Sequence, residues 1–106
     1  MSQKIRQLLS SLKSDLQAIY GKHLRALYLF GSYARGEEDK ESDLDILVML
    51  DDFERYGQEV DRTSELTSKL SLEYGVSISK VFMREKDWIS GQTPFLANVK
   101  QEAVLA

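Results

Sequence analysis

The sequence contains no cysteine and a single histidine, His23. Without cysteine there is no disulfide framework, no thiolate metal site and no cysteine nucleophile. Because His23 is the only histidine and lies before the first predicted strand, the chain can assemble neither a histidine metal cluster nor a Ser-His relay. Because His23 precedes the first predicted strand, we interpret it as a surface residue.

The chain also lacks an excess of positive charge and any long apolar run. It has 14 Lys and Arg against 17 Asp and Glu, a net charge of −3 and a pI near 5.1. No global basic field therefore attracts it to nucleic acid or to an anionic membrane. No segment approaches the roughly 18 apolar residues of a membrane span. The opening "MSQKIRQLLSSLKSDLQ" has no unbroken apolar stretch, so it is not a signal peptide, and we expect a cytoplasmic protein.

Two segments have apolar residues at helical spacing. The first, Ile5–Ile19, alternates leucine and isoleucine with charged and small polar residues and is predicted to end near Gly21. The second follows Asp51 and Asp52, either of which can cap a helix, and is predicted to end at Gly75. These patterns predict two amphipathic helices.

Three segments are typical of strands, and one further helix follows them. Residues 26–30 form a short apolar run, residues 44–50 carry alternating apolar residues, and residues 76–83 are β-branched and alternating. Thr93 followed by Pro94 is typical of a helix cap and first-turn proline. The predicted order is helix, strand, strand, helix, strand, helix, which indicates a small α/β domain with about three strands, in one compact unit of 106 residues.

Two aspartates, Asp43 and Asp45, alternate with apolar residues at the start of the second strand. Residues two apart in a strand point to the same face, with Cα atoms roughly 6.5 to 7 Å apart. Two carboxylates at this spacing repel each other unless a cation lies between them, and carboxylate oxygens suit Mg²⁺. Taken alone, such a pair is more commonly a solvated strand edge.

A Gly-Ser turn, Gly31 and Ser32, follows the first strand. Glycine allows the backbone to approach a ligand closely, and a helical turn opening here would offer free N–H groups and the Ser32 hydroxyl to phosphate. Arg35 lies within one turn of Ser32 and can reach a phosphate. Pairing of Arg35 with Asp39, Glu41 or an acid on the inner face is an equally good interpretation.

The two motifs together indicate more than either does alone. A strand, a phosphate-binding turn and metal-binding carboxylates on the neighbouring strand form a suitable layout for a nucleoside triphosphate. The turn would hold the β- and γ-phosphates, and a metal ion on Asp43 and Asp45 would bridge to the α-phosphate. Phosphoryl-type transfer chiefly requires such positioning and charge neutralisation.

The stretch "GSYARGEEDKESDLD" resembles the minimal nucleotidyltransferases of the DNA polymerase β superfamily, which carry Gly-Ser, ten residues, then Asp-x-Asp. The matching residues are Gly31, Ser32, Asp43 and Asp45. The resemblance extends over nearly the whole chain, so residues 1–106 are interpreted as one nucleotidyltransferase domain. It implies a mixed β-sheet flanked by helices, a Mg²⁺ cofactor and a nucleotide substrate, usually ATP.

The resemblance also implies a partner. Many minimal nucleotidyltransferases are encoded beside a small helical HEPN-domain protein, often an RNase toxin, and act as its antitoxin. Some members transfer AMP to a tyrosine of that toxin. A domain of 106 residues has little surface for a closed acceptor site, so the acceptor is expected to dock from outside in a homo- or hetero-oligomer.

The sequence departs from the family pattern at the third strand. Active members usually have a third carboxylate there, whereas this chain has Ser77 and Ser79, and the nearest acids are Glu73 and Glu85. Loss of a general base alone often costs about 10²–10⁴-fold in rate. The sequence therefore leaves two functions open: a Mg²⁺-dependent protein adenylyltransferase, or a binding module that neutralises a HEPN partner by complex formation.

Overall fold

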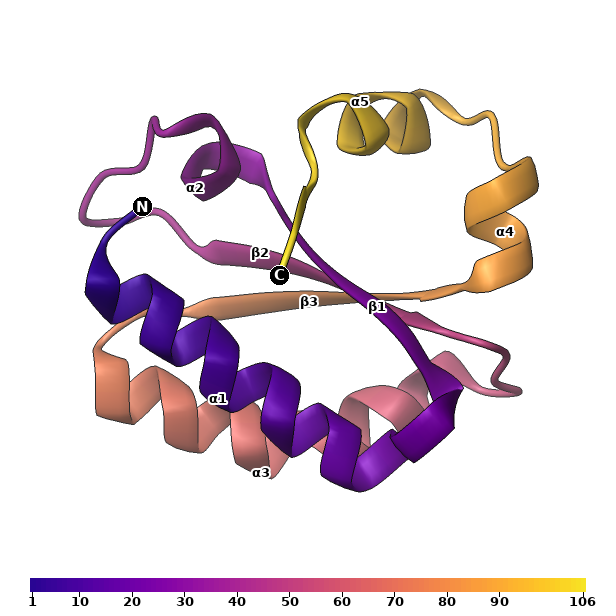
Figure 1. The fold of residues 1–106 in the computed structure, drawn as a ribbon, viewed down its shortest axis with the longest axis horizontal. Helices are drawn as coiled ribbons and strands as arrows, with labels where there is room; N and C mark the ends of the chain where they lie inside the picture. Colours follow the sequence, from indigo (N-terminus) through magenta and orange to yellow (C-terminus); the bar gives the residue numbers. More distant parts are fainter.

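The computed structural model describes all of residues 1–106 and is built on a four-stranded mixed sheet in the order β3-β2-β1-β4 (Figure 1). The strands, in chain order, are β1 Leu24–Phe30, β2 Leu44–Leu50, β3 Ile78–Arg84 and β4 Val104–Leu105. The pairings β1–β2 and β1–β4 are antiparallel, and β2–β3 is parallel. The predicted mixed α/β class is confirmed, with a short fourth strand added at the edge.

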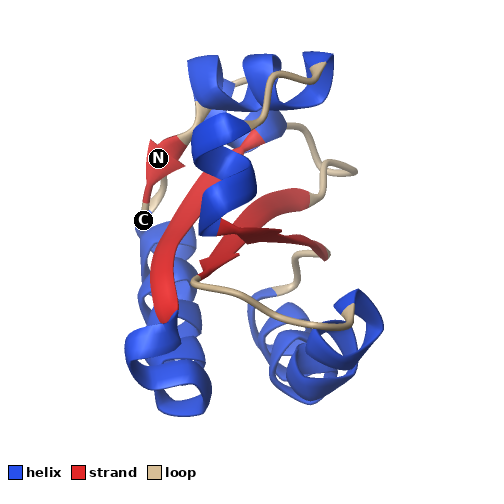
Figure 2. Ribbon diagram, turned by 90° about the vertical axis from the view of Figure 1, so that its right-hand side faces the viewer, coloured by secondary structure: helices blue, strands red, loops and turns tan.

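Five α-helices surround the sheet. They are α1 Gln3–Tyr20, α2 Gly31–Arg35, α3 Tyr56–Tyr74, α4 Glu85–Ser90 and α5 Pro94–Glu102, with a 3-10 turn at Gly21–His23. The long helices α1 and α3 lie side by side on one face, and α4 and α5 lie on the other (Figures 1 and 2). None of these helices is both long enough and apolar enough to cross a membrane.

The strand β2 contributes to both faces because its side chains alternate. Leu44, Ile46 and Val48 are fully buried in the main core against α1 and α3. Leu47 and Met49 point to the other face and pack with Val99 of α5 in a smaller apolar cluster. Burial on both faces explains why β2 is almost uninterruptedly apolar after Asp45.

Most of the predicted helix ends are confirmed, and one helix start is wrong. Gly21, Gly36 and Gly75 follow α1, α2 and α3 with φ values of 57°, 72° and 66°, a left-handed region that glycine adopts readily. Thr93 caps α5 by accepting a hydrogen bond from the Leu96 amide. However, α3 begins at Tyr56 and not directly after Asp52.

Asp51 and Asp52 do not cap α3 because their carboxylates bind elsewhere. Asp51 contacts the His23 ring at 2.6 Å and accepts the Asp52 amide, and Asp52 accepts the Phe53 amide. The chain then remains non-helical up to Arg55.

Candidate functional site

Asp43 and Asp45 lie at the start of β2, on the face of the sheet that α5 covers. Asp45 is half-buried within β2, and Asp43 immediately precedes the strand and is exposed. Asp45 follows the same alternation as Leu47 and Met49, so it shares their face and not that of the main core. The sequence prediction that both carboxylates share one side stays a prediction for Asp43, which lies just outside the strand; Asp43 is near enough for its charge to act on Asp45.

Gly31 brings the Gly-Ser turn directly against Asp45. Phe30, the last residue of β1, is the antiparallel partner of Asp45, so Gly31 begins α2 beside that carboxylate. Gly31 has a φ of 75°, and a Cβ added to it would lie 2.2 Å from Oδ2 of Asp45. Only glycine lets the backbone and the carboxylate approach this closely. The two sequence motifs are therefore in contact.

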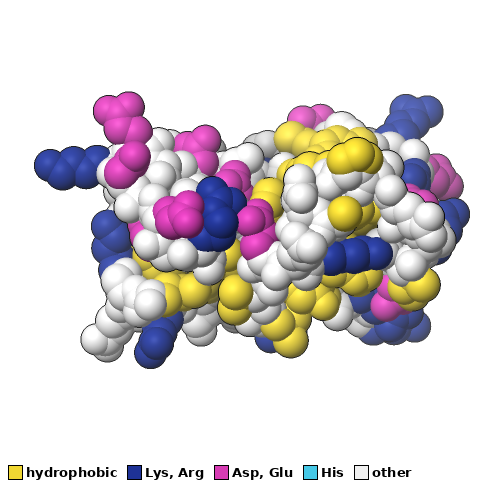
Figure 3. All heavy atoms as spheres, turned by 90° about the horizontal axis from the view of Figure 1, so that it is seen from above, with side chains coloured by type: hydrophobic (Ala, Val, Ile, Leu, Met, Phe, Trp, Pro, Cys, Tyr) yellow, Lys and Arg dark blue, Asp and Glu magenta, His cyan; other side chains and the backbone are white.

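The helix α2 holds the remaining residues of the turn. Ser32 is half-buried next to Gly31, and Arg35 in the last turn is exposed. Tyr33 is half-buried and packs against the main core. Figure 3 looks down on α2, α4 and α5 and shows acidic and basic side chains interleaved over α2, with apolar side chains gathered toward α5.

Arg35 is paired with two glutamates. Its Nη1 atom donates to Oε2 of Glu102 at 2.9 Å, and its Nε atom donates to Oε2 of Glu37 at 3.2 Å. The other oxygen of Glu102 accepts the Gly31 amide at 3.0 Å. The sequence interpretation of Arg35 as a partner of acids is confirmed, but its partners are Glu37 and Glu102 and not Asp39 or Glu41.

Glu102 is the residue of the site that sequence reasoning missed. It is the last residue of α5, 71 positions after Gly31, and its side chain is 23% exposed. The Arg35 guanidinium and then the Gly31 amide hold the pKa of Glu102 below its usual value, because both stabilise the charged carboxylate. No local pattern marks this glutamate, since only the packing of α5 beside α2 brings it here.

The carboxylates at the head of β2 have the electrostatics of a cation site. Burial, followed by the negative charge of Asp43, raises the pKa of Asp45, while Arg35 opposes this shift. Bringing a hard divalent cation between the two aspartates would remove their repulsion, and their oxygen ligands suit Mg²⁺. Asp43 and Asp45 therefore fit the metal that the sequence predicts, as a pair of carboxylates that leaves positions for water and phosphate oxygens.

The strand β3 places a serine where a third carboxylate would lie. Ser79 is the parallel partner of Asp45 in the sheet. Glu73 is exposed at the end of α3, and Glu85 pairs with Arg25 at 3.7 Å beyond the far end of β3, so neither reaches Asp45. The chain contains no group of three or more His, Cys, Asp or Glu side chains arranged to hold a metal ion.

Lys80 on β3 points away from the candidate site. It faces α3, where its ammonium donates to the hydroxyls of Thr63 and Thr67 at 2.9 and 3.0 Å. Burial lowers the pKa of Lys80. Because it lies on the opposite face of the sheet from Asp45, Lys80 is excluded from the candidate phosphate site.

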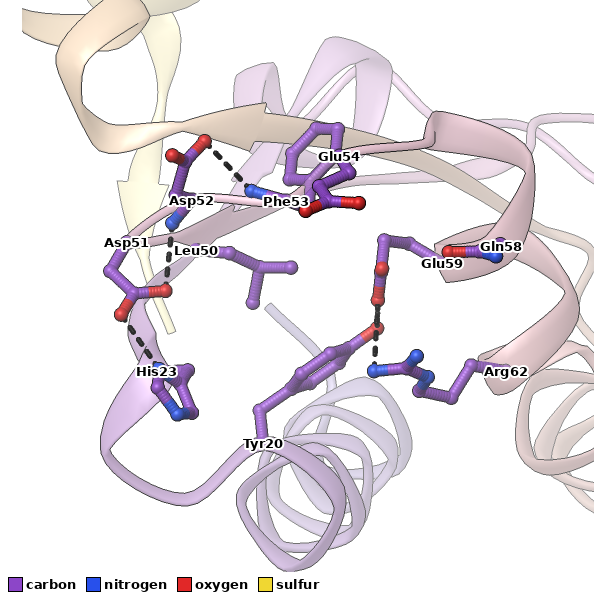
Figure 4. Close-up of a pocket in the computed structure, with 10 residues that line it drawn as sticks. All are labelled: Tyr20, His23, Leu50, Asp51, Asp52, Phe53, Glu54, Gln58, Glu59 and Arg62. Carbon is purple, nitrogen blue, oxygen red and sulfur yellow. Dashed lines mark hydrogen bonds and ion pairs between the residues drawn. The ribbon is translucent and has the colours of Figure 1, made fainter.

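A separate pocket of about 290 Å³ lies at the other end of β2, around Leu50 and Asp51 (Figure 4). In this pocket the Tyr20 hydroxyl donates to Oε1 of the buried Glu59 at 2.7 Å, and Arg62 lies 3.6 Å from the same oxygen. The Glu59 carboxylate therefore already has two partners, the Tyr20 hydroxyl and the Arg62 guanidinium. This pocket is distinct from the site at Asp43 and Asp45.

Comparison with known proteins agrees with the geometry. Two proteins of Methanocaldococcus jannaschii, provisionally named protein adenylyltransferases, are similar to this chain. One is 32% identical over 82 residues, which are 77% of this chain and 82% of that protein. The other is 39% identical over 83 residues, covering 77% of this chain and 72% of that protein.

Solved structures share the fold. A toxin–antitoxin complex with AMP-PNP gives a TM-score of 0.62 at 24% identity, over 90% of this chain and 69% of that chain. A complex of a tri-AMPylated Shewanella oneidensis HEPN toxin with an MNT antitoxin gives 0.54 at 20% identity, over 92% and 70% of the two chains. At these identities the likeness is one of fold.

A family model defines the relationship. The model described as "Nucleotidyltransferase domain" matches residues 5–105, and this span includes Gly31, Asp43, Asp45 and Glu102. Together with a relative that is 32% identical over most of its length, this match shows that the chain belongs to the nucleotidyltransferase domain family.

Proposed function

We propose that the chain is a Mg²⁺-dependent nucleotidyltransferase that transfers AMP from ATP to a hydroxyl group, a tyrosine, of a HEPN-family toxin and thereby acts as its antitoxin. The observation that carries this proposal is the contact between Gly31 and Asp45, which brings a backbone amide and a carboxylate pair within one small site. The provisional names of the relatives and the AMP-PNP and HEPN complexes among the structural neighbours support the same substrates.

In the proposed reaction the acceptor hydroxyl oxygen forms a bond to the α-phosphorus of ATP. The bond between that phosphorus and the bridging oxygen to the β-phosphate breaks, pyrophosphate leaves, and the hydroxyl proton passes to solvent. The Gly31 amide and the Arg35 guanidinium are the donors for the leaving phosphates, with Ser32 beside them. Asp43 and Asp45 would hold Mg²⁺, which when bound neutralises charge on the triphosphate.

One observation favours a second function for the same fold. Ser79 lies opposite Asp45 in place of an acid, so the chain supplies no third carboxylate on β3 to act as a base or a second metal ligand. Neutralisation of the HEPN partner by complex formation, with little or no transfer, is the function that this observation favours.

The test is transfer from α-labelled ATP with Mg²⁺, using the chain alone and together with the product of the neighbouring gene, which the proposal expects to be a HEPN protein. Intact mass and peptide mapping identify the modified residue. We expect a gain of one AMP or more on a tyrosine of the partner. We expect this label to be absent with an Asp43→Asn, Asp45→Asn double variant, because the cation site is removed.

The matched control is Asp61→Asn, an acid-to-amide change at an exposed position of α3, on the opposite face of the sheet from the carboxylate pair. A stable complex that gives no label with the unaltered chain would overturn the transfer proposal and establish the binding module. Label that persists in the double variant would show that Asp43 and Asp45 do not hold the metal.

A further inference from the structure

The carboxylate of Glu102 binds the donors that the proposed function assigns to phosphate. Its Oε1 atom accepts the Gly31 amide at 3.0 Å, and its Oε2 atom accepts Nη1 of Arg35 at 2.9 Å. A carboxylate with two oxygens on a backbone N–H and a guanidinium has the same hydrogen-bond pattern as a phosphate on these groups. Glu102 therefore occupies an anion-binding position from within the chain.

We propose that Glu102 is an internal competitor of the nucleotide triphosphate, so that phosphate binding at Gly31 and Arg35 requires Glu102 to leave. This inference rests on the proposed function for the identity of the anion. It assigns to Glu102 the weakening of nucleotide binding, whereas the carboxylate pair and the Gly-Ser turn are proposed to strengthen it.

The charges of the site explain why Glu102 must leave and cannot remain beside the phosphates. The Asp45 carboxylate already lies against Gly31, and Glu102 places a second carboxylate on the Gly31 amide. A triphosphate adds further negative charge at the same donors. Both oxygens of Glu102 are engaged by Gly31 and Arg35, so phosphate can gain these hydrogen bonds only if Glu102 gives them up.

The position of Glu102 in the fold makes its release feasible. It is the last residue of α5, and the buried Val99 and Leu96 anchor that helix three and six residues upstream. The chain after it forms only the two-residue strand β4, whose Val104 and Leu105 are both exposed. Because the Glu102 side chain is itself partly exposed, it can rotate away from Gly31 and Arg35 while β4 stays paired with β1.

The decisive experiment measures anion affinity in the full chain with and without this carboxylate. The probes are inorganic tripolyphosphate without metal and Mg²⁺–AMP-PNP. The binding of each probe is measured by calorimetry and by the NMR chemical shift of the Gly31 amide. The variant is Glu102→Gln, which keeps the shape but removes the charge. The matched control is Glu37→Gln, because Glu37 also pairs with Arg35 but donates nothing to, and accepts nothing from, Gly31.

We expect Glu102→Gln to bind tripolyphosphate about 10-fold more tightly than the parent, the scale of one charge-assisted hydrogen bond, with the Gly31 resonance shifting on binding. Glu37→Gln should change the affinity by about 2-fold or less, because its pair with Arg35 is exposed. If the Gln variant fails to fold, Glu102→Asp keeps the charge but is too short to hold both donors, and it should also bind more tightly.

The outcomes separate this inference from the proposed function. Unchanged or weaker binding by the Glu102 variants, with the parent still binding Mg²⁺–AMP-PNP, would overturn the competitor role alone. Tighter binding by Glu102→Gln without AMP transfer to any partner would uphold the competitor role and overturn the transferase. No binding of either probe by the parent or the variants would overturn both.

Discussion

At the scale of single residues, Gly31 determines whether the candidate site can form. Its φ of 75° is a left-handed conformation, and a Cβ there would lie 2.2 Å from Oδ2 of Asp45. Gly36 also has a left-handed φ, of 72°, but nothing lies within 4 Å of the place where its Cβ would be. An alanine at either position would strain the backbone, but only an alanine at position 31 would also overlap a neighbouring side chain.

We predict that Gly31→Ala lowers the free energy of unfolding more than Gly36→Ala does. The shared backbone strain should cost about 1 kcal/mol in each variant, and the overlap with Asp45 should add about 1–3 kcal/mol at Gly31 alone. Urea denaturation of both variants measures these costs. Adding Asp45→Ala to Gly31→Ala should recover most of the excess, and equal costs at the two glycines would contradict the close contact.

The residues of the candidate site differ in how well the sequence predicts them. Asp45 faces the same side as Leu47 and Met49 because strand alternation is a local rule, and Gly31 lies beside it because β1 and β2 pair next to each other. Glu102 could not be predicted, because its contact with Gly31 spans 71 residues and depends on how α5 packs. The assignment of these residues to metal and phosphate stays a prediction.

At the scale of elements, the start of α3 is the clearest difference between pattern and structure. Aspartates at positions 51 and 52 are good caps by type, yet Asp51 is bound to His23 and to the next amide. Helix α3 instead begins after Arg55, which has an extended backbone and gives no side-chain cap. A local rule fails here because a tertiary contact competes for the capping carboxylate.

We predict that Arg55→Ser stabilises the protein. A serine hydroxyl at this position can accept the amide of Gly57 or of Gln58, the second of which now bonds only the Arg55 carbonyl at 3.2 Å. The resulting Ser-Tyr-Gly-Gln sequence has the form of a capping box. The free energy of unfolding should rise by about 0.5–1 kcal/mol in urea denaturation. Arg55→Ala removes the same charge without adding an acceptor, so an equal gain in that variant would show that capping is not the cause.

At the scale of the whole molecule, the sheet has two unlike faces, and the sequence predicts only one of them well. The core against α1 and α3 follows from helical and strand periodicity. The other face depends on α4, α5 and β4, which are short, and on Trp88, which stacks on Tyr28 at 5.0 Å between ring centres. Short elements give weak periodic signals, so β4 and its pairing with β1 were not predictable from pattern alone.

This second face carries the candidate site, and the protein retains there a half-buried carboxylate that opposes folding. Asp45 has a raised pKa because of burial and the charge of Asp43, with Glu102 adding to the shift and Arg35 reducing it. The folded state therefore binds a proton at Asp45 more tightly than the unfolded state does. As the pH rises from about 3.8 through the raised pKa, stability is lost, and the loss is complete once the pH lies above that raised pKa.

We predict that Asp45→Asn increases the free energy of unfolding at neutral pH and abolishes stabilisation by Mg²⁺–AMP-PNP, because a functional carboxylate is exchanged for a neutral isostere. The gain over the parent should shrink as the pH falls through the raised pKa of Asp45 toward 3.8, since the parent then becomes neutral at this position too. Denaturant titrations of both proteins across this range, each with and without the ligand, measure the two effects.

Asp43→Asn is the matched control: it removes a similar charge from an exposed position, so its direct gain should be smaller. A gain for Asp45→Asn that is independent of pH would show that lost charge at this carboxylate is not what stabilises the fold.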